Sequence, residues 1–400
     1  MTKRFLRGIA HVCAIAGLCA STGLAADPVI TVSAKQRYPW NGLVDLQFTI
    51  NGDSGTKYDT SFTAKDMVGG TNITMATVRK ADGTPANVAK EQLLPGTYNW
   101  VWDATADLPK DWKSDRVTVT GKTVEPTHLY MVIDLSGGAN ASSYPISYLD
   151  AIPSGGWSDT YKTTKLVLRR IEPGTFMMGG QYKVTLTKPF YIGVFEVTQK
   201  QYMLVTGSNP IQSNWVGYGE KLPVYPDYTN IRGGEKGTLW PLNDQVDANS
   251  FMGMMRSRCN QTFDLPTDAQ WEYACRGGTT SLYNNGGNTE ADLSKLARYY
   301  GNKVGNPATP AIPGQYLPNN FGLYDMHGNM FEFVLDWGGA LSGNVTDPKG
   351  PSTGVDRVKR GGGYFSYADK CTSSYRYYST LGMLSSEYDF GFRICLTLPN

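Results

Sequence analysis

The sequence lacks several features that would point directly to a function. Histidine occurs only 3 times in 400 residues, and the 37 basic side chains nearly balance the 35 acidic ones. This near-neutral charge, without a basic stripe or a block of like charges, argues against a nucleic-acid-binding protein. Beyond residue 26 no segment has the ~18 apolar residues that a transmembrane helix needs. A nucleic-acid partner and a transmembrane segment are therefore not expected.

The first 26 residues have the pattern of a cleaved signal peptide. Three basic residues precede an apolar run over residues 9–18 that is too short to cross a bilayer, and small residues lead to an acceptable cleavage site ending at Ala25. We therefore expect a periplasmic or secreted protein. Its mature chain keeps two histidines, His128 and His327, which rules out a three-histidine metal site within one chain.

Cysteine is also scarce, and its distribution depends on the signal peptide. Two of the six cysteines lie within residues 1–26. The others would lie in an oxidising compartment, where an even number of cysteines favours disulfides. They are Cys259, Cys275, Cys371 and Cys395. Cys371 raises a particular question, because it follows the glycine-rich stretch RGGGYFSYADK (360–370) and is either a reactive thiol or half of a structural disulfide.

Residues 27–124 are predicted to form an all-β domain. Several segments alternate apolar and polar residues, and turn-rich pieces such as residues 51–55 separate them. The strand-like segments are residues 29–34, 43–50, 72–78, 98–102 and 116–121. Short strands at this spacing are typical of an immunoglobulin-like sandwich. The domain carries no chemical motif, so a spacer or adhesion role is favoured over a catalytic one.

A mixed α+β domain is expected over residues 164–400. Residues 125–163 are predicted to be a connecting segment whose Gly/Ser/Pro-rich composition indicates a loop and whose aromatic residues indicate packing on the C-terminal domain. Helices are predicted after Thr198, Asp247 and Thr267. The third of these begins with a T-x-x-Q capping box formed by Thr267 and Gln270.

Four segments of this domain resemble, in order, the main signatures of the formylglycine-generating enzyme family, also called the sulfatase-modifying factor family. They are LPTDAQWEYACRGG (265–278), NNFGLYDMHGNMFEFVLDW (319–337), RVKRGGGYF (357–365) and DFGFRICL (389–396). The resemblance extends over about residues 171–398 and does not cover residues 27–124. It implies a compact fold related to C-type lectins, with little regular secondary structure.

The resemblance implies a copper site that this sequence does not complete. Catalytic members of the family oxidise a sulfatase cysteine to formylglycine, using oxygen and a copper ion held by two thiolates. The second catalytic cysteine corresponds to Cys371, but the first corresponds to Ser366. A serine hydroxyl is a hard donor and does not replace a soft thiolate on Cu(I). The expected binding cleft consists of Gly363, Tyr364, Thr372 and Asp389, and the first, third and fourth of these also depart from the family pattern.

These departures predict a non-oxidising family member that binds a protein or glycan at the cell envelope. The alternative is an active copper-dependent oxidase that uses Cys371 with an unrecognised partner, and copper is expected as a cofactor only in that case. A thiol-independent hydrolase is disfavoured because no nucleophile–base pair is visible. The aromatic-rich run over residues 364–378 supplies either a binding surface or core packing, and the sequence leaves both open.

The resemblance also implies two disulfides. It pairs Cys259 with Cys395, whereas the usual partner of Cys275 would fall at Arg376. Cys371 is the remaining thiol nearby, so a structural Cys275–Cys371 disulfide is favoured over a free nucleophile at residue 371.

The segment HGNMFE (327–332) resembles a calcium site of the same family. The resemblance makes Asn329 and Glu332 the side-chain ligands of a structural Ca²⁺, an ion that prefers hard oxygen donors. The alternative is that Glu332 forms a buried ion pair and Asn329 caps a turn.

Overall fold

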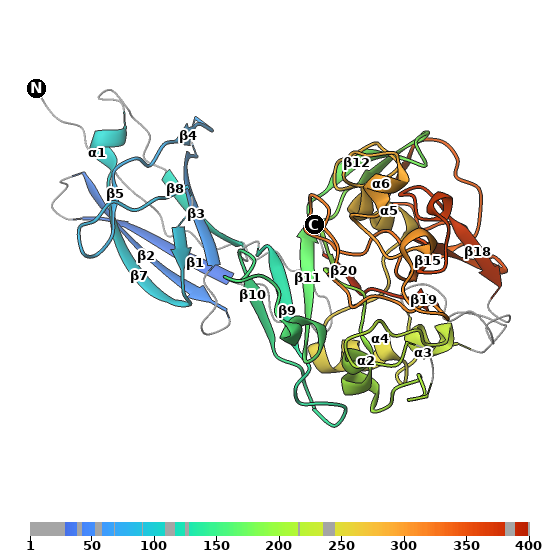
Figure 1. Cartoon of the computed structure of the whole chain (residues 1–400). Helices are drawn as coiled ribbons and strands as arrows, with labels where there is room; N and C mark the ends of the chain where they lie inside the picture. The colour runs from blue at the N-terminus through green and yellow to red at the C-terminus, as the bar shows by residue number, and fades with distance from the viewer. Residues whose placement is uncertain are drawn as a thin grey trace, which may run out of the picture. The chain divides into compact units, whose positions relative to one another are not determined.

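The chain divides into two compact units, Met1–Thr127 and His128–Asn400, which are described separately (Figure 1). The computed structural model describes residues 29–37, 42–52, 58–67, 69–89, 91–108, 117–124, 128–214, 217–234, 245–380 and 389–398. The predicted signal peptide over residues 1–26 lies outside this described part. None of the described helices combines the length and the apolar character that a membrane crossing requires.

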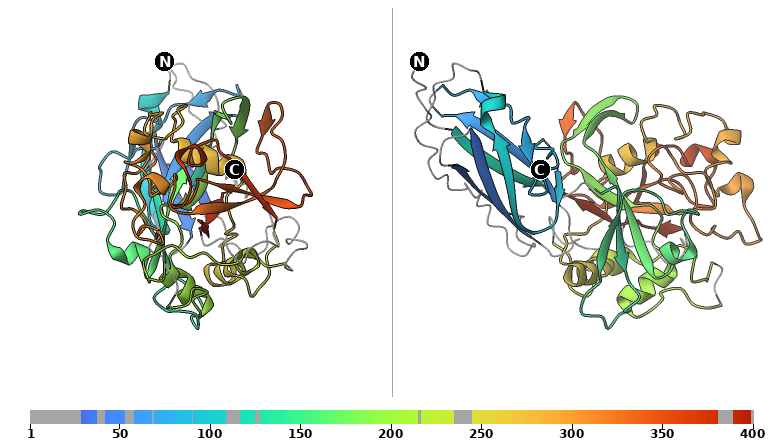
Figure 2. Two further views of the ribbon diagram at one scale, coloured as in Figure 1. Left: turned by 45° about the vertical axis from the view of Figure 1, so that its right-hand side comes forward. Right: turned by 90° about the vertical axis from the view of Figure 1, so that its left-hand side faces the viewer.

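The described strands of the first unit form two sheets (Figure 2). One has the order β1-β2-β7-β5, with β1 Val29–Gln36, β2 Leu43–Asn51, β5 Val78–Arg79 and β7 Gly96–Asp103. The other has the order β4-β3-β6 with β8 paired to β3, and consists of β3 Tyr58–Asp66, β4 Asn72–Ile73, β6 Glu91–Leu93 and β8 Val117–Val124. A short helix, α1 Ala104–Asp107, follows β7. This arrangement confirms the predicted β-sandwich.

The sandwich follows from the alternation of side chains along its strands. On β2, Leu46, Phe48 and Ile50 are buried, whereas the residues between them are partly or fully exposed. The centroid of the Phe48 ring lies 4.6 Å from that of Phe62 on β3, so the two sheets share one core. The predicted strand at residues 72–78 is instead two short strands, because β4 pairs with β3 in one sheet and β5 pairs with β7 in the other.

The described strands of the second unit form three sheets. The largest has the order β10-β9-β11-β14-β20 and consists of β9 Tyr130–Asp134, β10 Ile146–Leu149, β11 Lys165–Ile171, β14 Phe190–Gly193 and β20 Cys395–Thr397. The second joins β12 Gly174–Met178, β13 Tyr182–Leu186 and β16 Val345–Thr346. The third has the order β18-β17-β15-β19, with β15 Phe331–Trp337, β17 Asp356–Arg360, β18 Tyr377–Thr380 and β19 Phe390–Gly391. Residues 128–163, expected as part of a connecting segment, therefore contribute two strands to the largest sheet.

The helices of the second unit are short. They are α2 Gln199–Thr206, α3 Tyr228–Arg232, α4 Phe251–Cys259, α5 Asp268–Arg276 and α6 Glu290–Leu293, with 3₁₀ turns η1 Asp159–Lys162, η2 Tyr300–Asn302 and η3 Ala368–Lys370. Helices α2, α3 and α4 lie together in the unit (Figure 1). The predicted capping box starts α5, because the Gln270 N–H donates to Thr267 Oγ1 and the Thr267 N–H donates to Gln270 Oε1. The mixed α+β fold with little helix is the one expected.

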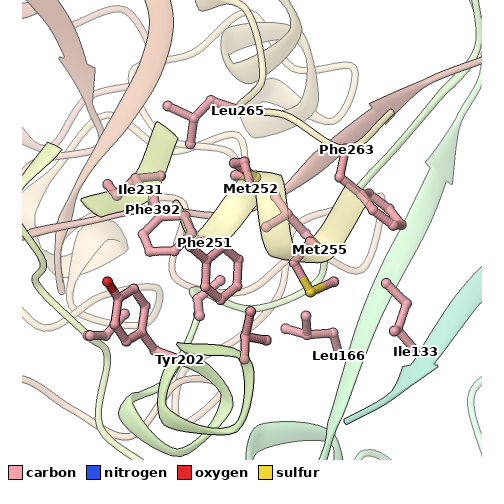
Figure 3. Packing of buried hydrophobic residues seen from close by; sticks show 14 of the residues in the cluster. Ile133, Leu166, Tyr202, Ile231, Phe251, Met252, Met255, Phe263, Leu265 and Phe392 are labelled. Atoms are coloured by element: carbon pink, nitrogen blue, oxygen red, sulfur yellow. The ribbon is translucent and has the colours of Figure 1, made fainter. Parts of the chain in front are cut away.

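The main core of this unit lies between α2, α4 and the five-stranded sheet (Figure 3). The Phe251 ring of α4 stacks on Tyr202 of α2, with ring centroids 5.4 Å apart, and meets Phe392 edge-on at 5.1 Å. Ile133 of β9 and Leu166 of β11 belong to the same core. Such aromatic pairs add roughly 0.5–1.5 kcal/mol beyond the area that they bury. Because Phe392 belongs to the C-terminal signature, this core holds that signature against the helices.

A buried ion-pair network fixes the strand that leads into the glycine-rich stretch. The Arg360 guanidinium at the end of β17 contacts the carboxylates of Asp268 and Glu272 on α5, the second at 2.7 Å. Arg360 also donates to the carbonyls of Ser373 and Tyr375, at 3.1 and 3.2 Å. A buried charge of this kind is tolerated only when its hydrogen bonds are satisfied. The Arg360 side chain therefore links helix α5 to the chain segment that follows η3.

Candidate functional site

The glycine-rich stretch after β17 turns sharply back over Cys371. Gly361 and Gly362 have φ values of 91° and 78°, which lie in the left-handed region that glycine adopts without steric cost. A Cβ atom at residue 362 would come within 2.6 Å of Cys371 Sγ. The sulfur is therefore covered by the backbone of the same loop that carries it.

Cys371 is a buried thiol. It lies in a small cluster with Tyr283, Leu293 and Ala297. Burial raises the pKa of the Cys371 thiol well above its ordinary value. A nucleophilic or metal-binding cysteine needs the thiolate form. The surroundings of Cys371 favour the protonated, packed thiol instead.

Ser366, at the position of the missing cysteine, is a turn residue. Its Oγ accepts a hydrogen bond from the Gly363 N–H at 3.0 Å, and its own N–H donates to the Gly363 carbonyl at 2.9 Å. Its carbonyl accepts a hydrogen bond from the Tyr300 N–H at 2.9 Å, which ties the loop to η2. A serine hydroxyl that satisfies a nearby backbone group is common in turns. Ser366 thus closes the loop.

Three of the four residues expected in the binding cleft are buried, namely Gly363, Tyr364 and Thr372. Burial raises the pKa of the Tyr364 phenol. Asp389 is partly exposed. A Cβ atom at residue 363 would overlap the Asp389 carboxylate. The two departures from the family pattern at residues 363 and 389 therefore belong together, because a serine at residue 363 would displace the Asp389 side chain.

The aromatic-rich run divides between core and surface. Tyr364 is buried, and Tyr375 and Tyr377 pack against the main core. The exposed members are Phe365, Tyr367 and Tyr378. Core packing therefore accounts for the first three of these residues, and the other three are exposed at the surface.

Tyr300 and Lys303 lie beside this surface and were missed in the sequence. The ring centroids of Tyr300 and Tyr367 are 4.6 Å apart. Lys303 Nζ lies 3.9 Å from the centroid of the Tyr300 ring, a cation–π distance. The stretch around Tyr300 has no periodicity that would place it next to residue 367, so only the folded chain brings these side chains together.

The four cysteines are free, buried thiols, and neither predicted disulfide is present. The Cys275 thiol donates to a backbone carbonyl at 3.6 Å, and the Cys395 thiol donates to a glutamine side chain at 3.9 Å. Burial raises the pKa of Cys259 and of Cys275 to about 12. A disulfide needs sulfur atoms ~2.05 Å apart. The structure differs from the expected pairs Cys259–Cys395 and Cys275–Cys371 because these sulfurs have packed against other groups.

His327 is hydrogen-bonded to the backbone of the loop at Cys371. Its Nδ1 donates to the Cys371 carbonyl at 2.7 Å, and its Nε2 accepts a hydrogen bond from the Asn284 N–H at 3.0 Å. The Cys275 sulfur lies 4.0 Å from the same Nε2. These partners select one neutral tautomer, and burial lowers the pKa of His327 to about 4. His327 therefore positions the backbone at Cys371.

Glu332, a predicted calcium ligand, is half of a buried ion pair. Arg393 donates from Nε to Glu332 Oε2 at 2.7 Å and from Nη2 to Oε1 at 2.5 Å. The Trp271 indole N–H donates to the same Oε2 at 2.7 Å. All three side chains are buried. Protein donors thus occupy both oxygens of the carboxylate, which is the alternative that the sequence left open.

Asn329, the other predicted ligand, is also fully engaged. Its Oδ1 accepts a hydrogen bond from the Ala311 N–H at 2.8 Å, and its Nδ2 donates to Glu196 at 2.5 Å. Its carbonyl accepts a hydrogen bond from the Tyr364 N–H at 2.8 Å. Asn329 and Glu332 therefore do not fit the calcium ion that the resemblance implies, since Ca²⁺ takes about 6–8 oxygen ligands. Within the described ranges no three or more His, Cys, Asp and Glu side chains are grouped to hold a metal.

Comparison with known proteins identifies the family of the domain that contains these residues. Residues 158–398 match the sulfatase-modifying factor enzyme 1-like domain. The chain is similar to the formylglycine-generating enzyme of Mus musculus, with 36% identity over 126 residues that cover 28% of the chain and 32% of that enzyme. It therefore spans about a third of the mouse enzyme's length.

Two further relatives carry different names. The chaperone protein LppX of Paenibacillus barcinonensis is 32% identical over 224 residues, which cover 48% of this chain and 75% of that protein. The serine/threonine-protein kinase pkn1 of Chlamydia caviae is 37% identical over 131 residues, which cover 32% of this chain and 20% of that protein. Among solved structures, Treponema denticola variable protein 1 aligns with a TM-score of 0.47 and 26% identity, covering 59% of this chain and 96% of that one.

Proposed function

The chain belongs to the sulfatase-modifying factor enzyme 1-like family through residues 158–398, and we propose that it is a non-oxidising member that binds a protein or glycan at the cell envelope. The observation that carries the proposal is the pair Ser366 and Cys371. Ser366 stands where the family resemblance requires the first catalytic cysteine, and Cys371 is a buried thiol beneath Gly362.

The residues present do not fit the copper ion of the oxidising members. Cu(I) is held by two soft thiolates. Here one of the two positions is a hydroxyl that accepts a hydrogen bond from Gly363, and the other is a thiol whose pKa is raised by burial. No oxidation step is therefore assigned to Ser366 or Cys371.

A binding role is supported by the aromatic side chains that the loop exposes. Phe365 and Tyr367 lie at the surface next to Ser366, on a loop that η2 and the buried His327 hold in place. Rigid aromatic side chains supply contact area at low entropic cost. The varied names of the relatives, which include a chaperone protein and a protein kinase, support a use of this domain beyond oxidation. The expected signal peptide is the basis for placing the protein at the cell envelope.

Mass spectrometry of a cysteine peptide tests the proposal. The mature chain is loaded with copper and incubated with a sulfatase-type cysteine peptide, reductant and oxygen, and a formylglycine-generating enzyme serves as the positive control. We expect no aldehyde product. Aldehyde formation that disappears in Cys371→Ala would overturn the proposal in favour of the copper-dependent oxidase.

A further inference from the structure

Three exposed aromatic side chains and one cation lie on η2 and on the glycine-rich loop, two segments that are hydrogen-bonded to each other. Tyr300 is 37% exposed at the start of η2, and Phe365 and Tyr367 are 45% and 63% exposed in the loop before η3. The Tyr300 and Tyr367 rings are 4.6 Å apart at their centroids and tilted by 43°. Lys303 Nζ lies over the Tyr300 ring. These four residues are called the aromatic ledge below.

Backbone hydrogen bonds and one buried ring hold the ledge in place. The Tyr300 N–H donates to the Ser366 carbonyl at 2.9 Å, which joins the two segments that carry the rings. The Phe365 ring packs on the buried Tyr364 ring at a centroid distance of 4.7 Å. The Tyr367 carbonyl accepts a hydrogen bond from Lys370 N–H at 3.0 Å. A surface that is ordered before binding loses little conformational freedom when a ligand arrives.

The ledge carries a positive charge that no described carboxylate neutralises. Lys303 is exposed, and its ammonium group contacts the Tyr300 ring. The acidic side chain Asp369, in the same loop as Tyr367, is already paired with Lys370 at 3.3 Å. The Lys303 end of the ledge is therefore complementary to an anionic group.

The exposed aromatic area of the ledge suits a small ligand better than a protein partner. Aromatic side chains present about 200 Å² each when fully exposed, so these three exposed fractions amount to about 300 Å². A stable protein interface needs about 800 Å² on each partner. An apolar patch of about 300 Å² is large enough to be functional on a monomer but matches only one or two rings of a small ligand.

We propose that the aromatic ledge binds an acidic glycan, with sugar rings stacked on Tyr367 and Phe365 and a uronate carboxylate paired with Lys303. The electron-rich face of an aromatic ring attracts the C–H groups on the apolar face of a sugar. A charge-assisted hydrogen bond from an ammonium group selects a carboxylate. This inference rests on the proposed binding function and gives it a ligand class.

Calorimetric titration of the mature chain with tetragalacturonate tests the assignment. Neutral maltotetraose and the acidic peptide hexaglutamate are titrated in parallel. We expect tetragalacturonate to bind and the other two to bind at least about tenfold more weakly, a difference of about 1.4 kcal/mol. Tyr367→Ala and Phe365→Ala are each expected to weaken binding about tenfold, since each removes one stacking face. Lys303→Gln should also weaken binding and reduce its dependence on salt.

Tyr148→Ala is the matched control, because Tyr148 on β10 is 41% exposed and lies outside the ledge. It should bind tetragalacturonate like the wild type. Stronger binding of hexaglutamate, equal binding of maltotetraose, or no binding of tetragalacturonate would each overturn the glycan assignment. Equal losses in Tyr148→Ala and Tyr367→Ala would overturn the location. None of these outcomes changes the aldehyde measurement, so failure of the ledge is distinguishable from failure of the proposed function.

Discussion

Gly362 and Cys371 pack so closely that residue 362 has no room for a side chain. A Cβ atom there would stand 2.6 Å from the Cys371 sulfur, and Gly362 has a φ of 78°. We expect Gly362→Ala to lower the free energy of unfolding by about 3 kcal/mol, of which ~1–2 comes from the left-handed backbone and the rest from overpacking. Urea denaturation of the mature chain measures the change.

Gly286→Ala is the control for this prediction. Gly286 has a φ of 86°, but nothing lies within 4 Å of the position of its Cβ. Its substitution should show only the backbone contribution, about 1–2 kcal/mol. Equal losses in the two variants would mean that Cys371 does not restrict residue 362.

The cysteines are expected to be free in the purified protein. Denaturation without reductant of a chain that lacks residues 1–26 should reveal four reactive thiols, from Cys259, Cys275, Cys371 and Cys395. In the native state at pH 8 these thiols should react slowly, because they are buried and a pKa of about 12 leaves little thiolate at Cys275. Ellman's reagent, applied with and without prior reduction, measures both states. A gain of two thiols on reduction would indicate a disulfide and contradict the structure.

The carboxyl group of Asp336 should make stability depend on pH. Asp336 is buried on β15 and accepts a hydrogen bond from the Asp268 N–H at 2.7 Å. Burial, together with repulsion from the Asp268 carboxylate, raises the pKa of Asp336 to about 7 from an ordinary 3.8. The protonated carboxyl therefore contributes stability that is complete below pH 4 and is lost as the pH rises through 7.

Asp336→Asn mimics the protonated form and removes this dependence. Relative to the wild type, the variant should gain about 2–4 kcal/mol of unfolding free energy between pH 4 and pH 8. Denaturation curves at several pH values measure the difference. A difference that stays constant with pH would mean that Asp336 does not titrate in this range.

Removal of calcium is expected to leave the melting temperature unchanged. Arg393 and Trp271 occupy both oxygens of Glu332. Glu332→Gln should cost about 3–5 kcal/mol with or without calcium, because it leaves the Arg393 charge buried and unpaired. Asp369→Asn is the control, since its exposed pair with Lys370 contributes little. A calcium-dependent rise in melting temperature that Glu332→Gln abolishes would restore the metal site.

Local patterns predicted the parts of the fold that depend on neighbouring residues. Thr267 and Gln270 form their capping box within one helical turn, so their spacing was sufficient. The sequence singled out Glu332 as a calcium ligand or half of a buried ion pair, but its partner Arg393 lies 61 residues away, and no periodic pattern identifies such a partner. Tyr300 and Tyr367 are likewise far apart in the sequence, so no local pattern predicts the contact between their rings. The sequence could therefore indicate where a cysteine of the family signature is replaced, at Ser366, but could not predict which side chains lie beside it.

Ser366→Cys is expected not to create a copper site, although it supplies the missing first cysteine of the family signature. The Ser366 hydroxyl faces the Gly363 N–H within its own turn, and the Cys371 sulfur is buried beneath Gly362. Two thiolates that hold Cu(I) must both be deprotonated and accessible to the metal, whereas burial raises the pKa of Cys371. Competition with bicinchoninate measures Cu(I) affinity in Ser366→Cys and in Ser366→Cys combined with Cys371→Ala. We expect equal, weak binding in both. Binding about 100-fold tighter in the single variant, or about 2.8 kcal/mol, would show that Cys371 can reach the metal and that one substitution separates this loop from a copper centre.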